Sequence, residues 1–218
     1  MVFSYNQYIT LHVQTLHICD ILNNINHMIQ IKTATFVRGV TDNENLIRDD
    51  LPQIAFIGRS NVGKSSLINT LVNNKSLARK SATAGRTQEI NFFLINNSHY
   101  FVDLPGYGYA RGSMSQRDLI TERIEGYLLN SDVVHHAVVL IIDANVGMTE
   151  SDLSMFQELA QHNAPVVIVA NKIDKLNQSD KQKNITLIKQ YAGQYPVVLF
   201  SSTKRTGVEE LLSHIMEA

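Results

Sequence analysis

The segment from Gly58 to Ser65 has the residue types and spacing of a phosphate-binding loop. It reads GRSNVGKS, which fits G-x-x-x-x-G-K-[ST], and it lies between an apolar run and a helical pattern. The glycines let the backbone bend so that successive N–H groups face a phosphate chain. Lys64 can then reach the β and γ oxygens, and the Ser65 hydroxyl can ligate Mg²⁺. The expected phosphate-binding residues are Gly58, Arg59, Ser60, Asn61, Val62, Gly63, Lys64 and Ser65.

A second motif, Asp103-Leu104-Pro105-Gly106, follows another short apolar run. The Asp103 carboxylate suits a water-mediated bond to Mg²⁺, and the Gly106 N–H can meet a γ-phosphate. D-x-x-G alone is common at strand ends. At this distance after a phosphate loop it indicates a sensor of the γ-phosphate.

The polar loop 81–88, which reads SATAGRTQ, lies between these two motifs. A threonine hydroxyl here can supply a second Mg²⁺ ligand and hold the loop closed while the γ-phosphate is bound. Thr83 and Thr87 both qualify on the residues alone.

A third motif, NKID at residues 171–174, follows a buried-strand pattern and is suited to reading a purine base. The Asp174 carboxylate can accept hydrogen bonds from guanine N1–H and the N2 amine together, a pair of donors that adenine lacks. The Lys172 stem can lie over the base, and Asn171 can tie neighbouring loops together. The backbone N–H of Ser202 can complete the pocket. The expected base-binding residues are Asn171, Lys172, Asp174, Phe200, Ser201 and Ser202.

Alternating strand and helix patterns after residue 50 must position these motifs. They predict a mostly parallel sheet with helices on both faces, in which one hairpin makes one strand antiparallel. Residues 32–40 add a possible edge strand. The predicted strands are 53–58, 89–95, 100–103, 137–143, 165–170 and 196–200. The predicted helices are 63–72, 115–130, one opening at Thr149, 180–191 and 208–216.

The bulk composition places few limits on partners but several on location. Basic and acidic residues nearly cancel, 19 against 20, although Leu51 to Gln88 holds six basic residues and no acidic one. Cys19 is the one cysteine, so no intramolecular disulfide can form. The N-terminus lacks the features of a signal peptide, and polar residues interrupt its apolar runs. We therefore expect a cytoplasmic protein with no membrane span. A monomer is the expected oligomeric state, although none of these features bears on it.

The domain organisation that we expect is an N-terminal extension, residues 1–30, followed by one nucleotide-binding domain, residues 31–218. Residues 1–30 do not join the strand and helix alternation. Translation from Met28 and a genuine extension are the two alternatives for this segment.

Several stretches together make the chain resemble the EngB (YihA/YsxC) family of bacterial GTP-binding proteins, in the TrmE–Era–EngA–EngB–septin group. The combination of GRTQ with DLPGYGYA is far more specific than a phosphate loop alone. The resemblance extends from about Ala34 to the C-terminus. It rests on GRSNVGKSSLIN (58–69), AGRTQEINFF (84–93), DLPGYGYA (103–110), NKID (171–174) and FSSTKRTG (200–207).

This resemblance implies a Ras-like G domain with six or seven strands, and a Mg²⁺-dependent GTPase switch. It selects Thr87 over Thr83 as the Mg²⁺ ligand and makes Lys64, Thr87 and Gly106 the catalytic set. It also implies a role in assembly of the large ribosomal subunit and a requirement in normal cell division and septation. The loop residues that it adds to the nucleotide site are Gly85, Arg86, Thr87, Gln88 and Glu89.

Tyr107 occupies the position after D-x-x-G where Ras-like enzymes carry a Gln that orients the attacking water. Tyrosine has no amide, so we expect slow intrinsic hydrolysis that a partner or an ion accelerates. Asn61 matches the phosphate-loop Asn that helps to hold K⁺ in related GTPases, which makes stimulation by K⁺ a hypothesis. The alternative is that Asn61 only caps the loop.

Two other classes of function stay open on the sequence. A P-loop ATPase or kinase is opposed by Asp174. A nucleotide-dependent scaffold with little intrinsic hydrolysis is favoured by Tyr107. For the switch on the ribosome, the basic residues expected to meet rRNA phosphates are Arg79, Lys80, Arg86, Arg111 and Arg117.

Overall fold

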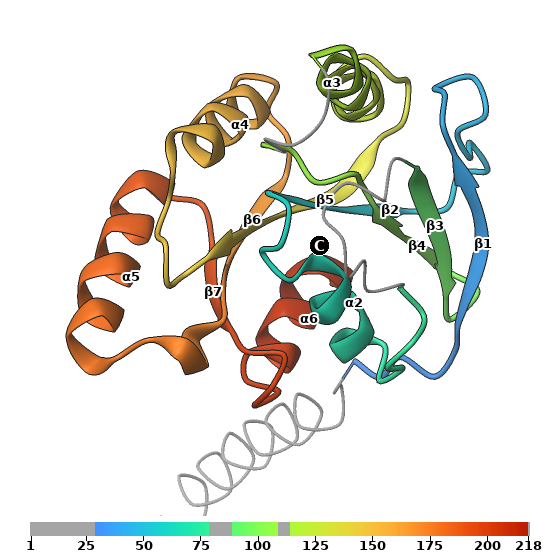
Figure 1. Ribbon diagram of the computed structural model, residues 1–218. Coiled ribbons are helices and arrows are strands. Elements are labelled where there is room, and N and C mark those ends of the chain that lie inside the picture. The colour runs from blue at the N-terminus through green and yellow to red at the C-terminus, as the bar shows by residue number, and fades with distance from the viewer. Residues whose placement is uncertain (1–28, 79–88, 109–113, 218) are drawn as a thin grey trace, which may run out of the picture. The chain divides into compact units, whose positions relative to one another are not determined.

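A seven-stranded sheet forms the centre of the computed structural model, which describes residues 29–78, 89–108 and 114–217. The strand order is β1-β3-β4-β2-β5-β6-β7 (Figure 1). The strands are β1 (Ala34–Val40), β2 (Gln53–Gly58), β3 (Ile90–Ile95), β4 (His99–Asp103), β5 (His135–Asp143), β6 (Val166–Asn171) and β7 (Val197–Phe200). Residues 1–28, on which the predicted extension falls, lie outside the described part of the chain.

Among the described strands, β3 alone runs against its neighbours, because it pairs antiparallel with both β1 and β4. The remaining pairs are parallel. Asn96 and Asn97 turn the β3–β4 hairpin with φ angles of 50° and 53°, a region that Asn tolerates better than most residues. The prediction of a mostly parallel sheet with one antiparallel strand is confirmed, as is the edge strand β1.

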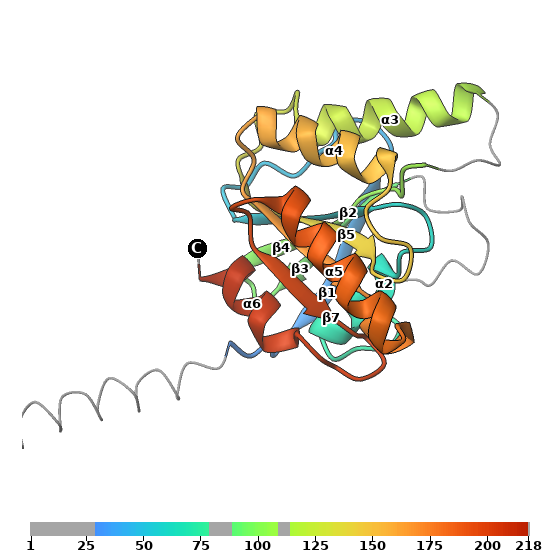
Figure 2. The same ribbon diagram turned by 90° about the vertical axis from the view of Figure 1, so that its left-hand side faces the viewer.

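Helices cover both faces of this sheet, as Figures 1 and 2 show. One face carries α2 (Lys64–Leu71) and α6 (Val208–Met216). The other carries α3 (Met114–Leu128), α4 (Glu150–Gln161) and α5 (Gln178–Ala192), and a short 3-10 helix, η1 (Ile173–Lys175), follows β6. Thr149 and Asp152 form the predicted capping box at the start of α4, in which each side chain bonds to the backbone of the other. None of the helices in the described residues is long and apolar enough to cross a bilayer.

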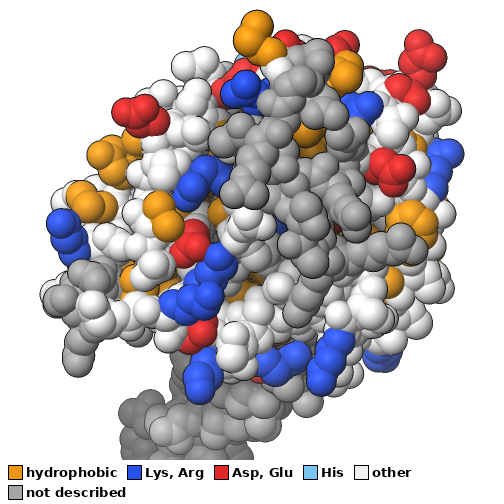
Figure 3. All heavy atoms as spheres, viewed as in Figure 1, with side chains coloured by type: hydrophobic (Ala, Val, Ile, Leu, Met, Phe, Trp, Pro, Cys, Tyr) orange, Lys and Arg blue, Asp and Glu red, His pale blue; other side chains and the backbone are white. Residues whose placement is uncertain are grey.

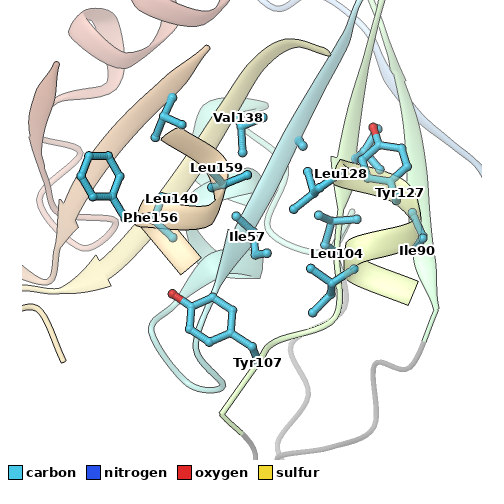
Figure 4. Close-up of a cluster of buried hydrophobic side chains, with 14 of the residues drawn as sticks. Ile57, Ile90, Leu104, Tyr107, Tyr127, Leu128, Val138, Leu140, Phe156 and Leu159 are labelled. Atoms are coloured by element: carbon cyan, nitrogen blue, oxygen red, sulfur yellow. The ribbon is translucent and has the colours of Figure 1, made fainter. Parts of the chain in front are cut away.

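The central strands β2, β5 and β6 are almost wholly buried, because helices cover them on both sides. Figure 4 shows part of the core between the sheet and helices α3 and α4, with Ile57, Leu104, Leu140 and Phe156 among its members. Since β2, β4, β5, β6 and β7 are parallel, their carboxyl ends meet at one edge of the sheet. The loops that carry the predicted motifs therefore converge there.

The opposite edge holds a half-buried histidine, His135, that should make the fold sensitive to acid. The His135 ring packs edge-on against Tyr127, with centroids 4.8 Å apart, and burial lowers the pKa of His135 to about 4. An unfolded chain protonates histidine near pH 6.5, so between about pH 6.5 and 4 the unfolded state binds more protons and stability falls as the pH drops. We expect this residue to remove about 2 kcal/mol of the free energy of unfolding between pH 7 and pH 5.

Chemical denaturation at those two pH values measures this loss. The variant His135→Gln cannot protonate in this range, so its stability should depend less on pH than that of the parent chain. Equal losses in parent and variant would refute the assignment.

Candidate nucleotide-binding site

The phosphate loop joins the buried end of β2 to the first turn of α2. Gly63 precedes α2 with a φ of 99°, and a Cβ at this position would lie 2.6 Å from Asn171 Nδ2, so only glycine fits without strain. Asn61 also has a positive φ, 70°. No side chain caps the start of α2, so this helix presents its free N–H groups and partial positive charge toward the loop. This geometry suits an anion.

Lys64 and Asp103, both buried, form an ion pair at the centre of the site. The Lys64 ammonium donates to Asp103 Oδ1 from the first turn of α2 to the end of β4. The structure thus brings together the cation predicted to grip phosphate and the carboxylate predicted to act on Mg²⁺. Ser65, the next residue along α2, carries a hydroxyl. A hydroxyl and a carboxylate are oxygen donors of the kind that Mg²⁺ prefers, so these residues fit that ion.

The D-x-x-G segment packs directly on the phosphate loop. Leu104 N–H donates to Phe56 O at 3.1 Å, which continues the hydrogen bonding of β4 with β2. A Cβ on Gly106 would lie 3.0 Å from both the backbone nitrogen and the hydroxyl of Ser60, so Gly106 permits this close approach. Ser60 N–H donates to the carbonyl of Tyr107 at 3.1 Å. Leu104 and Pro105 are buried, so the motif presents backbone rather than side chains.

The NKID loop is fastened to the phosphate loop by two side chains. Asn171 Nδ2 donates to Val62 O at 2.9 Å, which is the tie between loops that we expected for this residue. Lys172 Nζ donates to Asn61 O at 2.6 Å and to Asp143 Oδ2 at 2.7 Å. Sequence reasoning missed Asp143. Its signal was a carboxylate directly after the long apolar run of β5.

Asp174 lies exposed in η1, beside the loop that follows β7. Ser201 Oγ donates to Asp174 Oδ1 at 2.5 Å and accepts from Lys204 N–H at 3.1 Å, so Ser201 orients the carboxylate. Ser202 is next along this loop, half-buried. The Phe200 side chain is fully buried in the core, so its backbone is what faces the loop region.

Tyr107 is buried rather than aimed at the phosphate loop. Its hydroxyl donates to Asp152 Oδ1 of α4 at 2.8 Å. Burial raises the pKa of Tyr107, and the Asp152 carboxylate raises it further, so the phenol stays protonated. Arg59 Nε reaches the same carboxylate at 3.1 and 3.0 Å. Sequence reasoning saw in Asp152 only a helix cap.

Of the loop residues 85–89 that were predicted to join the nucleotide site, the structure describes only Glu89. Glu89 is exposed directly before β3. The remaining residues predicted for this segment, including the Mg²⁺ ligand Thr87, lie outside the described residues, and their roles stay predictions; they are Gly85, Arg86, Thr87 and Gln88.

A phosphate loop, a D-x-x-G segment and an NKID loop at the carboxyl edge of a mostly parallel sheet define a P-loop GTPase. A family model described as 50S ribosome-binding GTPase matches residues 53–172. A probable GTP-binding protein EngB from Clostridium perfringens is 40% identical over 191 residues, which is 86% of this chain and 96% of that protein. One from Thermoanaerobacter pseudethanolicus is 41% identical over 186 residues, 84% of this chain and 96% of that protein. The chain belongs to the EngB family of GTP-binding proteins.

Solved structures confirm the predicted fold class. A crystal structure of a probable GTP-binding protein EngB superposes with a TM-score of 0.63 at 24% identity, covering 76% of this chain and 97% of that one. A variant of Aquifex aeolicus Era bound to GDP and AlF4⁻ gives a TM-score of 0.60 at 27% identity, with 76% and 56% covered. NFeoB from S. thermophilus, bound to GDP, AlF4⁻ and K⁺, gives 0.59 at 26% identity, with 77% and 62% covered.

Proposed function

We propose that this chain binds GTP together with Mg²⁺ and hydrolyses it to GDP and phosphate as a molecular switch. The observation that carries the proposal is the meeting of Lys64, Asp103 and Gly106 at the end of β4, fastened through Asn171 to the loop that holds Asp174. The residues proposed to bind the triphosphate and those proposed to bind the base thus lie at the same edge of the sheet.

Each predicted residue has a distinct part in this proposal. Residues 58–65 surround the phosphates, and the Lys64 ammonium contacts the β and γ oxygens. The Ser65 and Thr87 hydroxyls would hold Mg²⁺ directly, and Asp103 through a water. The ion, when bound, neutralises charge on the phosphate oxygens. The Gly106 N–H meets the γ-phosphate, so this segment distinguishes GTP from GDP.

The Asp174 carboxylate favours binding of guanine nucleotides over adenine nucleotides. This preference argues against the alternative function of a kinase or an ATPase. Its carboxylate is exposed, and Ser201 holds it in one orientation. Asn171 and Lys172 position the loop from the side of the phosphates.

Hydrolysis by the isolated chain should be slow. The Tyr107 hydroxyl donates to Asp152, so this side chain does not orient a water at the γ-phosphate. The same observation favours the second candidate function, a nucleotide-dependent scaffold. Phosphate release measured with and without large ribosomal subunits separates the two, because only a GTPase switch accelerates when its partner is added.

Potassium is the ion that we propose to stimulate hydrolysis. Asn61 is an exposed residue of the phosphate loop, and its backbone carbonyl accepts a hydrogen bond from Lys172 Nζ. A solved neighbour, NFeoB from S. thermophilus, was bound to GDP, AlF4⁻ and K⁺. Turnover in KCl should exceed turnover in NaCl by about tenfold or more, and Asn61→Ala should abolish the difference. Equal rates of the parent chain in the two salts would discard the proposal.

The large ribosomal subunit is the partner that we propose. In this proposal the chain acts in the cytoplasm in assembly of that subunit, and normal cell division and septation depend on this assembly. The support for this partner is that the matching family model is described as 50S ribosome-binding GTPase. Arg117 is exposed on α3. Arg205 and Lys75 are exposed on two loops that the bond from Arg205 Nη1 to Asn73 Oδ1, 3.2 Å, joins. Figure 3 shows several Lys and Arg side chains along the lower part of the molecular face that it views.

Co-sedimentation with purified subunits tests this partner. The chain should pellet with large subunits in a non-hydrolysable GTP analogue and much less in GDP, and added salt should weaken the binding because basic residues contact phosphates. Small subunits serve as the control. Equal pelleting with GTP analogue and GDP would overturn a nucleotide-dependent ribosomal role.

A further inference from the structure

We propose that Asp152 is a positioning residue which, through Tyr107 and Arg59, holds the γ-phosphate sensor in place, so that a carboxylate on α4 sets the ratio of GTP to GDP affinity. Asp152 itself lies outside the three nucleotide motifs. The inference rests on the proposed function, because it assumes that Gly106 N–H meets the γ-phosphate.

Asp152 is a completely buried carboxylate that joins three segments of the chain. It has no exposed surface. Arg59 Nε from the phosphate loop donates to both its oxygens, and the Tyr107 hydroxyl donates to Oδ1. Thr149 donates to Oδ2 through its N–H at 3.0 Å and its hydroxyl at 2.7 Å. A buried charge is costly unless it is fully bonded, and here five donor contacts stabilise it.

The backbone of Tyr107 is also joined to the phosphate loop. Its carbonyl accepts from Ser60 N–H, and Arg59 and Tyr107 form an isolated parallel β-bridge. Tyr107 as a whole is 8% exposed, and Figure 4 shows its ring turned inward beside Ile57. The segment after D-x-x-G is therefore anchored at its first residue by backbone, ring and hydroxyl together.

Gly106 lies between two fixed points. Leu104 continues the ladder with β2 on one side, and Tyr107 is anchored on the other. Its N–H donor thus has a set position before any ligand arrives, and a preorganised donor binds its target at a lower entropic cost. GDP has no γ-phosphate, so loosening this anchor should cost affinity for GTP alone.

The variant Tyr107→Phe tests the proposal, because it removes one hydroxyl and keeps the ring. Fluorescence titration should show weaker binding of a GTP analogue, by up to about tenfold, because the free energy of one buried hydrogen bond to a charged group sets the upper limit on what the anchor contributes; GDP affinity should change less than about twofold. Asp152→Asn should shift the ratio in the same direction, and the double variant should add less than the sum of both free-energy changes, because the two residues share one contact.

Tyr127→Phe is the matched control. Tyr127 is also completely buried, and its hydroxyl donates to Gln53 Oε1 at 2.9 Å, at the start of β2. Both phenylalanine variants should lower the free energy of unfolding, Tyr127→Phe by less because its lost acceptor is a neutral amide, but Tyr127→Phe should leave the GTP to GDP ratio unchanged. Equal weakening of GTP analogue and GDP in Tyr107→Phe, or no weakening of either, would overturn the proposal. Absence of guanine-nucleotide binding by the parent chain would instead refute the proposed function itself.

Discussion

The variant Asp174→Asn should bind guanine nucleotides much more weakly and xanthine nucleotides more tightly than the parent chain does. An aspartate accepts two hydrogen bonds from N1–H and the N2 amine, whereas asparagine presents one acceptor and one donor, which matches the N1–H and C2 carbonyl of xanthine. A pocket built around a hydrogen-bonded group rejects the mismatched partner strongly, so GTP affinity should fall roughly 10³-fold or more. Competition titrations with GTP, XTP and ATP measure the exchange.

Ser201→Ala provides a graded companion to this variant. Its hydroxyl orients Asp174 without replacing it, so GTP should weaken by only about tenfold, and xanthine should not be favoured. Asp118→Asn, an exposed carboxylate of α3, is the matched control and should bind GTP normally. Asp174→Asn with an unchanged preference for guanine would show that the base is read elsewhere.

Lys64→Met should abolish tight triphosphate binding and also weaken the fold. The side chain is buried against Asp103, so its loss leaves a buried carboxylate without its cation. Breaking such a pair typically costs about 3–5 kcal/mol of stability. GTP affinity should fall by about 100-fold or more, since both the charge and the contact with the β and γ oxygens are lost.

The double variant Lys64→Met/Asp103→Asn separates these two effects. Removing the second charge should restore part of the free energy of unfolding measured in denaturant, while GTP binding stays lost. If the single variant bound GTP as tightly as the parent, Lys64 would have no part in gripping phosphate.

The elements of the fold were predictable because their signals are local. Apolar runs bounded by polar residues located β2, β6 and β7. The predicted strand limits differ from those in the structure mainly where a strand begins with polar residues. β5 starts at His135, two residues before the apolar run, because His135 pairs with Gln53 at the start of β2. The convergence of the motif loops followed from parallel strands ending at one edge.

The side-chain partners within the site were not predictable in the same way. Asp152 lies 93 residues from Arg59 and 45 from Tyr107, and no local pattern marks residues that far apart as partners. The capping box at the start of α4 was by itself a sufficient reason for an aspartate at this position, so no further partner was sought for Asp152. Tyr107 was interpreted from the role of its position in other GTPases, whereas its inward direction depends on the space and the acceptor that α4 provides. Asp143 likewise acts through Lys172, 29 residues away.

Because β3 runs antiparallel to β4, the β3–β4 hairpin holds the start of β3 and the end of β4 at a fixed separation. Asn91 lies opposite Asp103, so the chain enters β3 at the edge where it leaves β4. The segment predicted to carry Thr87 therefore joins the hairpin beside the D-x-x-G motif, and the length of the turn at Asn96 and Asn97 does not affect that spacing. Deleting a single residue within β3 would shift one end of the hairpin by one strand position, about 3.4 Å, and invert every side chain beyond it. Insertions at the turn should be tolerated, whereas a deletion inside β3 should disable the switch.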